Sequence, residues 1–409
     1  MSVTFEDIKA AADLIEGHVL RTPSFRSDSL SRLLGFDVFL KLENLQHTSS
    51  FKPRGALVKL LSLDDASKTA GVVAASAGNH AQGVAFFAQN LGIPATIYMP
   101  TGTPFTKVRR TEELGAHVVL SGDGLAEARE AATAFANANG KQFVHPYDDE
   151  KIVTGQGTVG LEMLTDHPDL DILLIPIGGG GLIAGSAIAA KALKPDITII
   201  GVEAEAYPSM KNAVARIPDT SGGQTVAEGI AVKVPGAVTR PIIEELVAEY
   251  ILVSEASLEK SIQTYLESQR MVVEGAGAAT LAALMDDPAK FIGKKVGIVV
   301  SGGNIDSRLL SSILLRGLVR EGRLVRLRIG ITDAPGILAR VCGLIGDCGG
   351  NIVEVYHQRM FYDVPVKLAD VDVVVETMNG DHVNDIIETL KESGFPTRCL
   401  NDSSAEDGS

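Results

Sequence analysis

Three short runs of apolar, mostly β-branched residues are each followed at once by a loop of small or polar residues. The runs cover residues 72–75, 172–177 and 296–300. Their length and composition predict strands that are buried on both faces of a parallel sheet. Open α/β sheets bind ligands outside the carboxyl ends of their strands, so we expect the three loops to meet at a binding site.

The loops after these strands contain residues suited to anions and polar ligands. In chain order they read Ser76-Ala77-Gly78-Asn79-His80, Gly178-Gly179-Gly180-Gly181-Leu182 and Ser301-Gly302-Gly303-Asn304. Four successive glycines let backbone N–H groups converge on an anion, and the helix expected after them presents its positive end to the same point. The glycine loop therefore predicts a phosphate site. A turn that only tightens strand-to-helix packing is the simpler alternative.

The other two loops offer side chains for a ring and a carboxylate. Asn79, expected on the loop before a helix from about residue 81, can donate to a phenolate oxygen, while Ser76 and the N–H groups of Ala77 and Gly78 can bind a carboxylate. Ser76 or Asn79 could instead serve only as the cap of that helix. Ser301 can hydrogen-bond to a pyridine nitrogen without fully protonating it, which suits β-elimination. A simple polar turn is the alternative for Ser301.

One lysine stands among small, aromatic and cationic neighbours near the N-terminus, in Ser50-Phe51-Lys52-Pro53-Arg54-Gly55-Ala56. An amine that is partly desolvated can form an imine with an aldehyde cofactor and can also act as a base. Taken alone, Lys52 could be an ordinary solvated lysine. Its combination with the three loops makes it the candidate for covalent attachment of a cofactor.

These four segments, in this order, resemble the fold-type II pyridoxal-phosphate enzymes, and among them the threonine dehydratases, over most of the chain. The resemblance implies that Lys52 forms an imine with pyridoxal 5′-phosphate and that Phe51 flanks the ring. Asn79 would contact the ring hydroxyl and Ser301 the ring nitrogen. The implied phosphate site is made by Gly178, Gly179, Gly180, Gly181 and Leu182. The candidate catalytic residues are Lys52, Ser76, Ala77, Gly78, Asn79 and His80.

The reaction implied by the resemblance is β-elimination from a hydroxy amino acid, in which Lys52 removes the Cα proton. Threonine would give 2-oxobutyrate and ammonia, and serine would give pyruvate. One methyl group is worth only about 1–3 kcal/mol of discrimination in an apolar pocket, so we expect some serine turnover. Racemases of the same fold carry a serine where this chain has Ala77, so the resemblance favours dehydration over racemisation.

Other functions remain open at this stage. Residues 179–184 also match the dinucleotide pattern G-x-G-x-x-A, and Glu203 follows about 20 residues later, as in NAD-dependent oxidoreductases. That function would leave Lys52, Asn79 and Ser301 without roles. Within the lyase class, a serine dehydratase, a racemase-like enzyme and a hydroxyaspartate lyase are the alternatives. A non-catalytic amino-acid sensor is a more distant one.

Three acidic residues call for interpretation. Glu203 is a weak candidate for a cation ligand, because racemase-like relatives pair this carboxylate with an acid six positions later. Here that position is Ser209, so we predict no metal site and favour a plain strand-end carboxylate. Glu228 and Glu274 lie in segments that resemble those near the cofactor ring, and we expect them to support it.

Composition excludes several classes of function. A formal net charge of −14 argues against non-specific nucleic-acid binding. No apolar run reaches the roughly 20 residues of a membrane span, and the N-terminus lacks the pattern of a secretory signal. Cys342, Cys348 and Cys399 lack the C-x-x-C spacing of zinc or redox pairs, which fits a reducing cytoplasm. We therefore expect a cytoplasmic enzyme without a membrane partner.

The 409 residues suffice for two or three domains. Strands and helices alternate from about residue 38 to 305, which predicts an α/β fold with parallel sheets. The resemblance adds a two-lobed, tryptophan-synthase-β-like arrangement with the cofactor between the lobes. The expected divisions are a catalytic domain at 1–320 with a smaller lobe at about 38–147, a linker at 321–325, a second domain at 326–400 and a disordered acidic tail at 401–409.

The second domain has the predicted order strand–helix–strand–strand–helix–strand, which is that of a ferredoxin-like unit. Its segments at 333–338 and 349–352 resemble the amino-acid-binding regulatory domains called ACT. The effector positions implied by that resemblance are Gly336, Leu338, Asn351 and Ile352. We expect isoleucine, or valine, as the effector of an enzyme of isoleucine synthesis that forms a homo-oligomer, a tetramer or a dimer. A purely dimerising module is the alternative.

Overall fold

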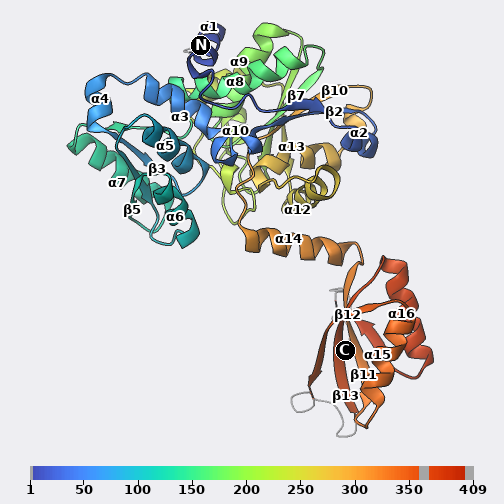
Figure 1. Ribbon diagram of the computed structural model, residues 1–409. Helices are drawn as coiled ribbons and strands as arrows, with labels where there is room; N and C mark the ends of the chain where they lie inside the picture. Colours follow the sequence, from blue (N-terminus) through green and yellow to red (C-terminus); the bar gives the residue numbers. More distant parts are fainter. Residues whose placement is uncertain (1–2, 359–367, 401–409) are drawn as a thin grey trace. The chain divides into compact units, whose positions relative to one another are not determined.

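The computed structural model describes residues 3–358 and 368–400. The chain divides into two compact units, Met1–Ile305 and Asp306–Ser409 (Figure 1). Helix α14 (Ser307–Arg320) is grouped with the second unit, whereas the sequence placed the end of the catalytic domain at 320. The tail expected at 401–409 lies outside the described residues. Among those residues, no helix combines the length and apolar character needed to cross a bilayer.

The first unit contains a six-stranded sheet. Its strands, in spatial order, are β1 (Ser24–Arg26), β2 (Asp37–Leu42), β10 (Lys295–Val300), β7 (Ile172–Pro176), β8 (Thr198–Ala204) and β9 (Glu249–Val253). All pairs are parallel except β1 with β2. Strand β2 stands at the predicted start of the smaller lobe. It belongs instead to the larger sheet, where it pairs in parallel with β10.

The second sheet of this unit has four parallel strands. They are, in spatial order, β5 (His117–Leu120), β4 (Ala95–Met99), β3 (Val72–Ala75) and β6 (Gln142–Phe143). Strand β3 is buried along its whole length, as its apolar sequence predicted. It is flanked by β4 and β6, so both of its edges are paired. The predicted α/β class with parallel sheets is confirmed.

Three helices with closely spaced backbones join the two sheets: α3 (Lys52–Leu61), α8 (Glu150–Asp166) and α9 (Gly181–Leu193). They approach through glycines. A Cβ on Gly185 would lie 2.2 Å from the carbonyl oxygen of Val153, and one on Gly155 would lie 2.6 Å from that of Arg54. Side chains larger than hydrogen are therefore excluded at these crossings, and the helices are held at short range.

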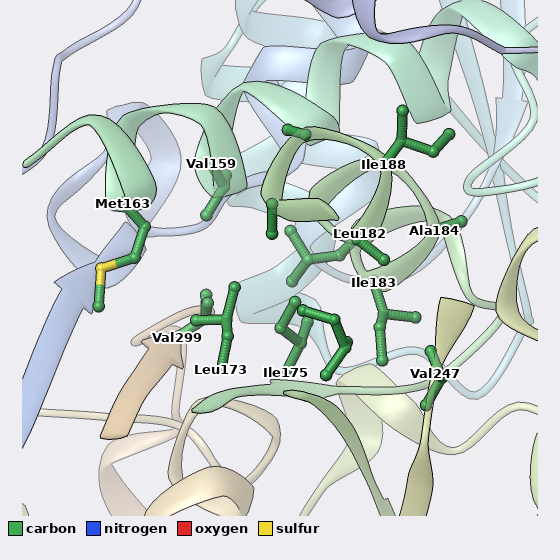
Figure 2. Close-up of a cluster of buried hydrophobic side chains, with 14 of the residues drawn as sticks. Val159, Met163, Leu173, Ile175, Leu182, Ile183, Ala184, Ile188, Val247 and Val299 are labelled. Atoms are coloured by element: carbon green, nitrogen blue, oxygen red, sulfur yellow. The ribbon is translucent and has the colours of Figure 1, made fainter. Parts of the chain in front are cut away.

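The main core lies between helices α8 and α9 and the larger sheet. Val159 and Met163 of α8 and Leu182 and Ile183 of α9 belong to this cluster, and both helices lie above Leu173 of β7 (Figure 2). The remaining helices of the unit are α1 (Phe5–Ile15), α2 (Asp28–Leu34), α4 (Asp65–Ala70), α5 (Asn79–Asn90), α6 (Phe105–Glu113), α7 (Leu125–Ala138), α10 (Ser209–Ala215), α11 (Thr239–Leu246), α12 (Glu255–Thr264) and α13 (Gly275–Asp286).

The second unit confirms the predicted βαββαβ order. After α14 come β11 (Leu324–Thr332), α15 (Ile337–Asp347), β12 (Asn351–Gln358), β13 (Leu368–Glu376), α16 (Gly380–Glu392) and β14 (Thr397–Cys399). The antiparallel sheet has the order β12-β13-β11-β14, which is that of a ferredoxin-like fold. Burial alternates along β11, so one face of this sheet packs on the helices and the other carries polar side chains.

Candidate active site

The segment that leads into α3 is bound to the loop after β10. The N–H of Phe51 donates to the carbonyl of Ser301 at 3.1 Å, and the N–H of Gly303 donates to that of Ser49 at 2.9 Å. These backbone bonds bring Lys52, the first residue of α3, beside Ser301. The sequence predicted that these two distant segments share a site, and the fold places them in contact.

Lys52 has the environment of a reactive amine. Its Nζ donates to the carbonyl oxygen of Pro146 at 2.8 Å and lies 5.0 Å from the centre of the Phe51 ring. Burial lowers the pKa of Lys52 to about 8, and the charge of Glu274 acts in the opposite direction. A lysine whose charge is disfavoured is more often neutral near physiological pH, and only the neutral amine is a nucleophile or base.

The asparagine loop is joined to the loop after β10 through the partly buried carboxyl group of Glu274. Asn79 donates through Nδ2 to Oε1 of Glu274 at 2.7 Å, and Asn304 donates through its own Nδ2 to Oδ1 of Asn79 at 2.7 Å. The N–H of Glu274 donates to the carbonyl of Gly302. Burial raises the pKa of Glu274 to about 7, while the bond from Asn79 acts to lower it. This network holds the Asn79 amide in one orientation.

Helix α5 begins at Asn79, two residues earlier than predicted. Asn79 and His80 therefore lie in its first turn and not on the preceding loop, because Gly78 occupies the N-cap position. The N-cap glycine has no side chain, and no other side chain caps the helix, so the predicted capping role of Ser76 or Asn79 is wrong. Ser76 Oγ instead accepts a hydrogen bond from the N–H of Gly78 at 3.2 Å. The positive end of α5 is left for a ligand, as a carboxylate site requires.

His80 is placed differently from the other candidates. The residue is 3% exposed, and Nε2 lies 2.9 Å from the carbonyl oxygen of Val144. Burial lowers the pKa of His80 to about 3, so the imidazole is neutral at physiological pH. Among the described residues, Nδ1 has no hydrogen-bond partner. The ring ties α5 to the chain after β6 and carries no positive charge into the site.

The glycine loop forms a crowded cup at the start of α9. Gly180 adopts a left-handed conformation, with φ of 96°, which favours glycine. A Cβ on Gly179 would lie 2.2 Å from Cγ of Tyr147, and one on Gly181 would lie 2.6 Å from Oε1 of Gln156. The Leu182 side chain is buried in the core, so this residue can offer only its backbone to a ligand (Figure 2).

The edges of this cup come from the start of α11 and from the segment between β6 and α8. Thr239 Oγ1 donates to the carbonyl of Gly179 at 2.7 Å, and the Tyr147 hydroxyl donates to the carbonyl of Val234 at 2.9 Å. Tyr147 directly follows Pro146, whose carbonyl receives the Lys52 bond. The cup and the lysine therefore share one short connecting segment.

Pyridoxal 5′-phosphate requires an amine, donors to the ring and an anion site in one place. The amine of Lys52, the amide of Asn79, the buried hydroxyl of Ser301 and the cup at 178–182 supply this set. The cup admits no Cβ at Gly179 or Gly181 because Tyr147 and Gln156 fill that space, and glycines allow backbone N–H groups to converge on an anion. The residues present fit the cofactor.

Glu203 lies within β8, and its carboxylate is hydrogen-bonded to backbone N–H groups of this chain. Its two carboxylate oxygens accept from the N–H groups of Met210 at 2.8 Å and Lys211 at 2.9 Å, at the start of α10. Burial raises the pKa of Glu203 to about 7. This geometry argues against both the ribose-binding and the cation-binding interpretations. In the described part of the chain, no group of three or more His, Cys, Asp or Glu residues could hold a metal ion.

The other acid that the sequence placed near the ring has a different setting. Glu228 is exposed, and its Oε2 forms an ion pair with Nζ of Lys107 at 2.6 Å. Lys107 belongs to α6 on the side of the smaller sheet. Glu228 thus links the two sheets of the unit at their periphery, whereas Glu274 lies beside Asn79.

Sequence reasoning missed a buried ion network beneath α3. Arg54 is fully buried and donates to Glu43 at 2.8 Å and to Glu162 at 2.7 Å. Lys41 of β2 donates to Glu162 as well. The only signal in the sequence was the position of Arg54, two residues after Lys52. Tyr147 and Gln156 were missed too, because nothing in their sequence neighbourhood indicates what they contact.

Comparison with known proteins gives sequence matches that bear on function. A family model described as pyridoxal-phosphate dependent enzyme matches residues 15–302. An L-threonine ammonia-lyase from Thermotoga maritima is 42% identical over 400 residues, which cover 97% of this chain and 100% of that protein.

Two solved structures are similar to the same part of the fold. Maize serine racemase is 33% identical, with a TM-score of 0.73 over 78% of this chain and 99% of that one. The processed form of threonine deaminase isoform 2 from Solanum lycopersicum is 34% identical, with a TM-score of 0.71 over 75% of this chain and 90% of that one.

Proposed function

Because the chain belongs to the pyridoxal-phosphate dependent enzyme family, we propose that it is a threonine ammonia-lyase, which converts L-threonine to 2-oxobutyrate and ammonia by β-elimination. The main support is Lys52, whose partly desolvated amine lies between the Ser301 loop and the segment beside the glycine cup. The Thermotoga maritima protein that this chain matches along its whole length is named for this reaction.

The residues divide the work of holding the cofactor. The cup at Gly178, Gly179, Gly180, Gly181 and Leu182 would hold the phosphate through backbone N–H groups. Phe51 would flank the ring, Asn79 would contact the ring hydroxyl and Ser301 the ring nitrogen. When bound, the cofactor supplies the electron sink that makes the Cα proton of the substrate acidic.

The remaining residues act on the substrate. Lys52 Nζ takes up the Cα proton, since its lowered pKa keeps a fraction of the amine neutral. Ser76, with the N–H groups of Ala77 and Gly78, binds the carboxylate at the positive end of α5. Ala77 has no proton to deliver to the opposite face, which supports elimination over racemisation. The proton that Lys52 takes from Cα and the departing β-hydroxyl together make up one water, and the enamine product tautomerises and hydrolyses in solution to the oxo acid and ammonia.

A direct test compares the wild-type protein with Lys52→Ala. Purified wild-type protein with pyridoxal 5′-phosphate is expected to show a visible absorbance band that borohydride traps at Lys52, and to release 2-oxobutyrate from threonine. Lys52→Ala should lose the band and lower the turnover by more than about 10³-fold. Absence of the band in the wild type would overturn the assignment, whereas nicotinamide-dependent turnover would support the oxidoreductase.

Substrate preference is tested separately. We propose that threonine is preferred to serine by about 10- to 100-fold in kcat/KM, because one buried methyl group contributes about 1–3 kcal/mol. Specificity constants for threonine, serine and 3-hydroxyaspartate would measure this directly. A higher value for serine or 3-hydroxyaspartate would assign the chain to the corresponding lyase.

We propose that the second unit is an ACT-type regulatory domain that binds isoleucine or valine. Its ferredoxin-like order supports this, as does the whole-length match to the Thermotoga protein. Gly336, with φ of 84°, is the N-cap of α15, Leu338 lies in the first turn of that helix, and Asn351 and Ile352 begin β12. Threonine kinetics with added isoleucine or valine should change in the wild type and not in Leu338→Ala or Asn351→Ala. No response to either amino acid would remove this role and leave a dimerising module.

We propose further that the enzyme is a cytoplasmic homo-oligomer, a dimer or a tetramer, that serves isoleucine synthesis. Leu33 and Ile292 are large apolar side chains more than half exposed on the first unit, and a partner subunit would bury such surface. Light scattering at micromolar concentration should report two or four subunits. A monomer at that concentration would contradict this.

A further inference from the structure

Gln156 is a buried polar side chain that the proposed mechanism does not use. It lies on α8 and is 1% exposed. Among the described residues, neither Oε1 nor Nε2 has a hydrogen-bond partner. A buried amide without a partner costs about 1–3 kcal/mol, so native proteins rarely keep one unless it serves a ligand or a water.

The position of this amide is specific. A Cβ on Gly181 would lie 2.6 Å from Oε1 of Gln156, and a Cβ on Gly55 would lie 3.1 Å from Nε2. Gly181 is the first residue of α9, and Gly55 is in the first turn of α3, which begins at Lys52. The amide therefore lies where the helix of the lysine meets the helix of the glycine cup. Both neighbouring positions are glycines, so the space that Cβ atoms would fill is left to Gln156.

The chemistry of the amide suits an anion. A 180° rotation of the side-chain amide exchanges its oxygen and nitrogen, so either can face the cup. An N–H donor directed at a phosphate forms a charge-assisted bond, which is stronger than one between neutral groups. The start of α9 already directs backbone N–H groups to the same place. Gln156 adds a side-chain donor that requires no positive charge.

We propose that Gln156 is a cofactor-binding residue, whose amide donates to the phosphate group held at the start of α9. This rests on the proposed placement of the phosphate at residues 178–182. Gln156 thereby couples phosphate binding to the position of α3, and so to Lys52. The partner is the phosphate and not the ring, which makes the role separable from those of Asn79 and Ser301.

The experiment compares two forms of the vitamin. Apo-protein of the wild type and of Gln156→Met, which keeps the side-chain length and removes the amide, is titrated with pyridoxal 5′-phosphate and with pyridoxal. Binding is followed by absorbance and protein fluorescence. We expect Gln156→Met to weaken binding of the phosphorylated form by about 10- to 100-fold and that of pyridoxal by less than about twofold. The melting temperature of apo Gln156→Met should equal or exceed that of the wild type, because an unpartnered buried amide is removed.

A matched control is Gln263→Met on α12, a buried glutamine that donates to Glu267 at 3.1 Å. It should leave the affinity for both forms unchanged. Gln156→Glu provides a second test if the methionine variant does not fold. Its added negative charge should weaken binding of the phosphorylated form more than that of pyridoxal, and more strongly at higher pH.

Two outcomes would overturn the inference. Equal loss of affinity for both forms would mean that Gln156 only shapes the site. Unchanged affinity with a lower melting temperature of the apo-protein would mean that the amide binds an ordered water only. In either case the wild-type protein would still convert threonine to 2-oxobutyrate. Failure of the proposed function would look different: the wild-type protein would bind the cofactor but release no 2-oxobutyrate.

Discussion

Helices of the two units differ in the packing of their glycines, and the arginines that make the main ion pairs differ in burial. In the first unit, glycines lie where helix backbones cross, and a Cβ at Gly155 or Gly185 would meet a carbonyl oxygen within 2.6 Å. In the second, Gly343 of α15 has no atom within 4 Å of where its Cβ would be. Arg54 of the first unit is fully buried in its ion pairs, whereas Arg328 of the second is partly exposed. The helix crossings at Gly155 and Gly185 therefore depend on close backbone contact, whereas α15 has room for a side chain at Gly343.

The largest contrast should come from the buried ions. Arg54→Met leaves the carboxylates of Glu43 and Glu162 without their main partner and should lower the free energy of unfolding of the first unit by about 3–5 kcal/mol. Arg328→Met leaves Asp372 its bond to Arg326 and should cost about 1 kcal/mol. Urea denaturation of each full-length variant, followed by cofactor absorbance and far-UV circular dichroism, measures both. Similar losses in the free energy of unfolding for the two variants would contradict the expected difference between a buried and a partly exposed ion pair.

Overpacking at a helix crossing should have the next largest effect. Gly185→Ala places a methyl group 2.2 Å from the carbonyl of Val153, which forces α8 and α9 apart at a cost of about 2–3 kcal/mol. Because α9 begins at the glycine cup, cofactor affinity should fall as well. Thermal unfolding and cofactor titration test these effects. A variant as stable as the wild type would mean that the two helices can separate freely.

The pH dependence of cofactor attachment tests the environment of Lys52. Burial disfavours the charged form and lowers its pKa to about 8, so the neutral amine is minor below that pH and dominant above it. The initial rate of attachment to apo-protein should rise about tenfold per pH unit between 6 and 7 and level off above about 8. Stopped-flow absorbance measures it. A rate that still rose tenfold between pH 9 and 10 would indicate an unperturbed, solvated lysine.

The smallest effect, of opposite sign, is expected in the second unit. Gly343→Ala replaces an exposed helical glycine with open space around it and should raise the stability of that unit by about 0.5–1 kcal/mol. Threonine turnover without effector should not change. Differential scanning calorimetry of the full chain would resolve the shift. A loss of stability would show that α15 contacts another subunit at this position.

Much of this fold could be predicted from short sequence patterns that do not depend on distant parts of the chain. The strand before the glycine run, the helix after it and the βαββαβ order all follow from patterns within ten or twenty residues. The start of α5 was predicted two residues late, because a glycine N-cap leaves no side-chain signal. The burial of Arg54 and Gln156 could not be predicted, since each contacts residues far away in the sequence.

The sequence alone determined the class of the fold, the chemical groups available and the order in which they occur along the chain. It did so because strand burial, glycine flexibility and the reactivity of an amine are properties of short segments. Only the tertiary structure decided which groups meet. Three contacts depend on packing between distant elements: the hydrogen bond from Phe51 to Ser301, the one from Lys52 to Pro146, and the one from the start of α10 to the carboxylate of Glu203. Such contacts arise from the shape of the whole core, which no local pattern contains.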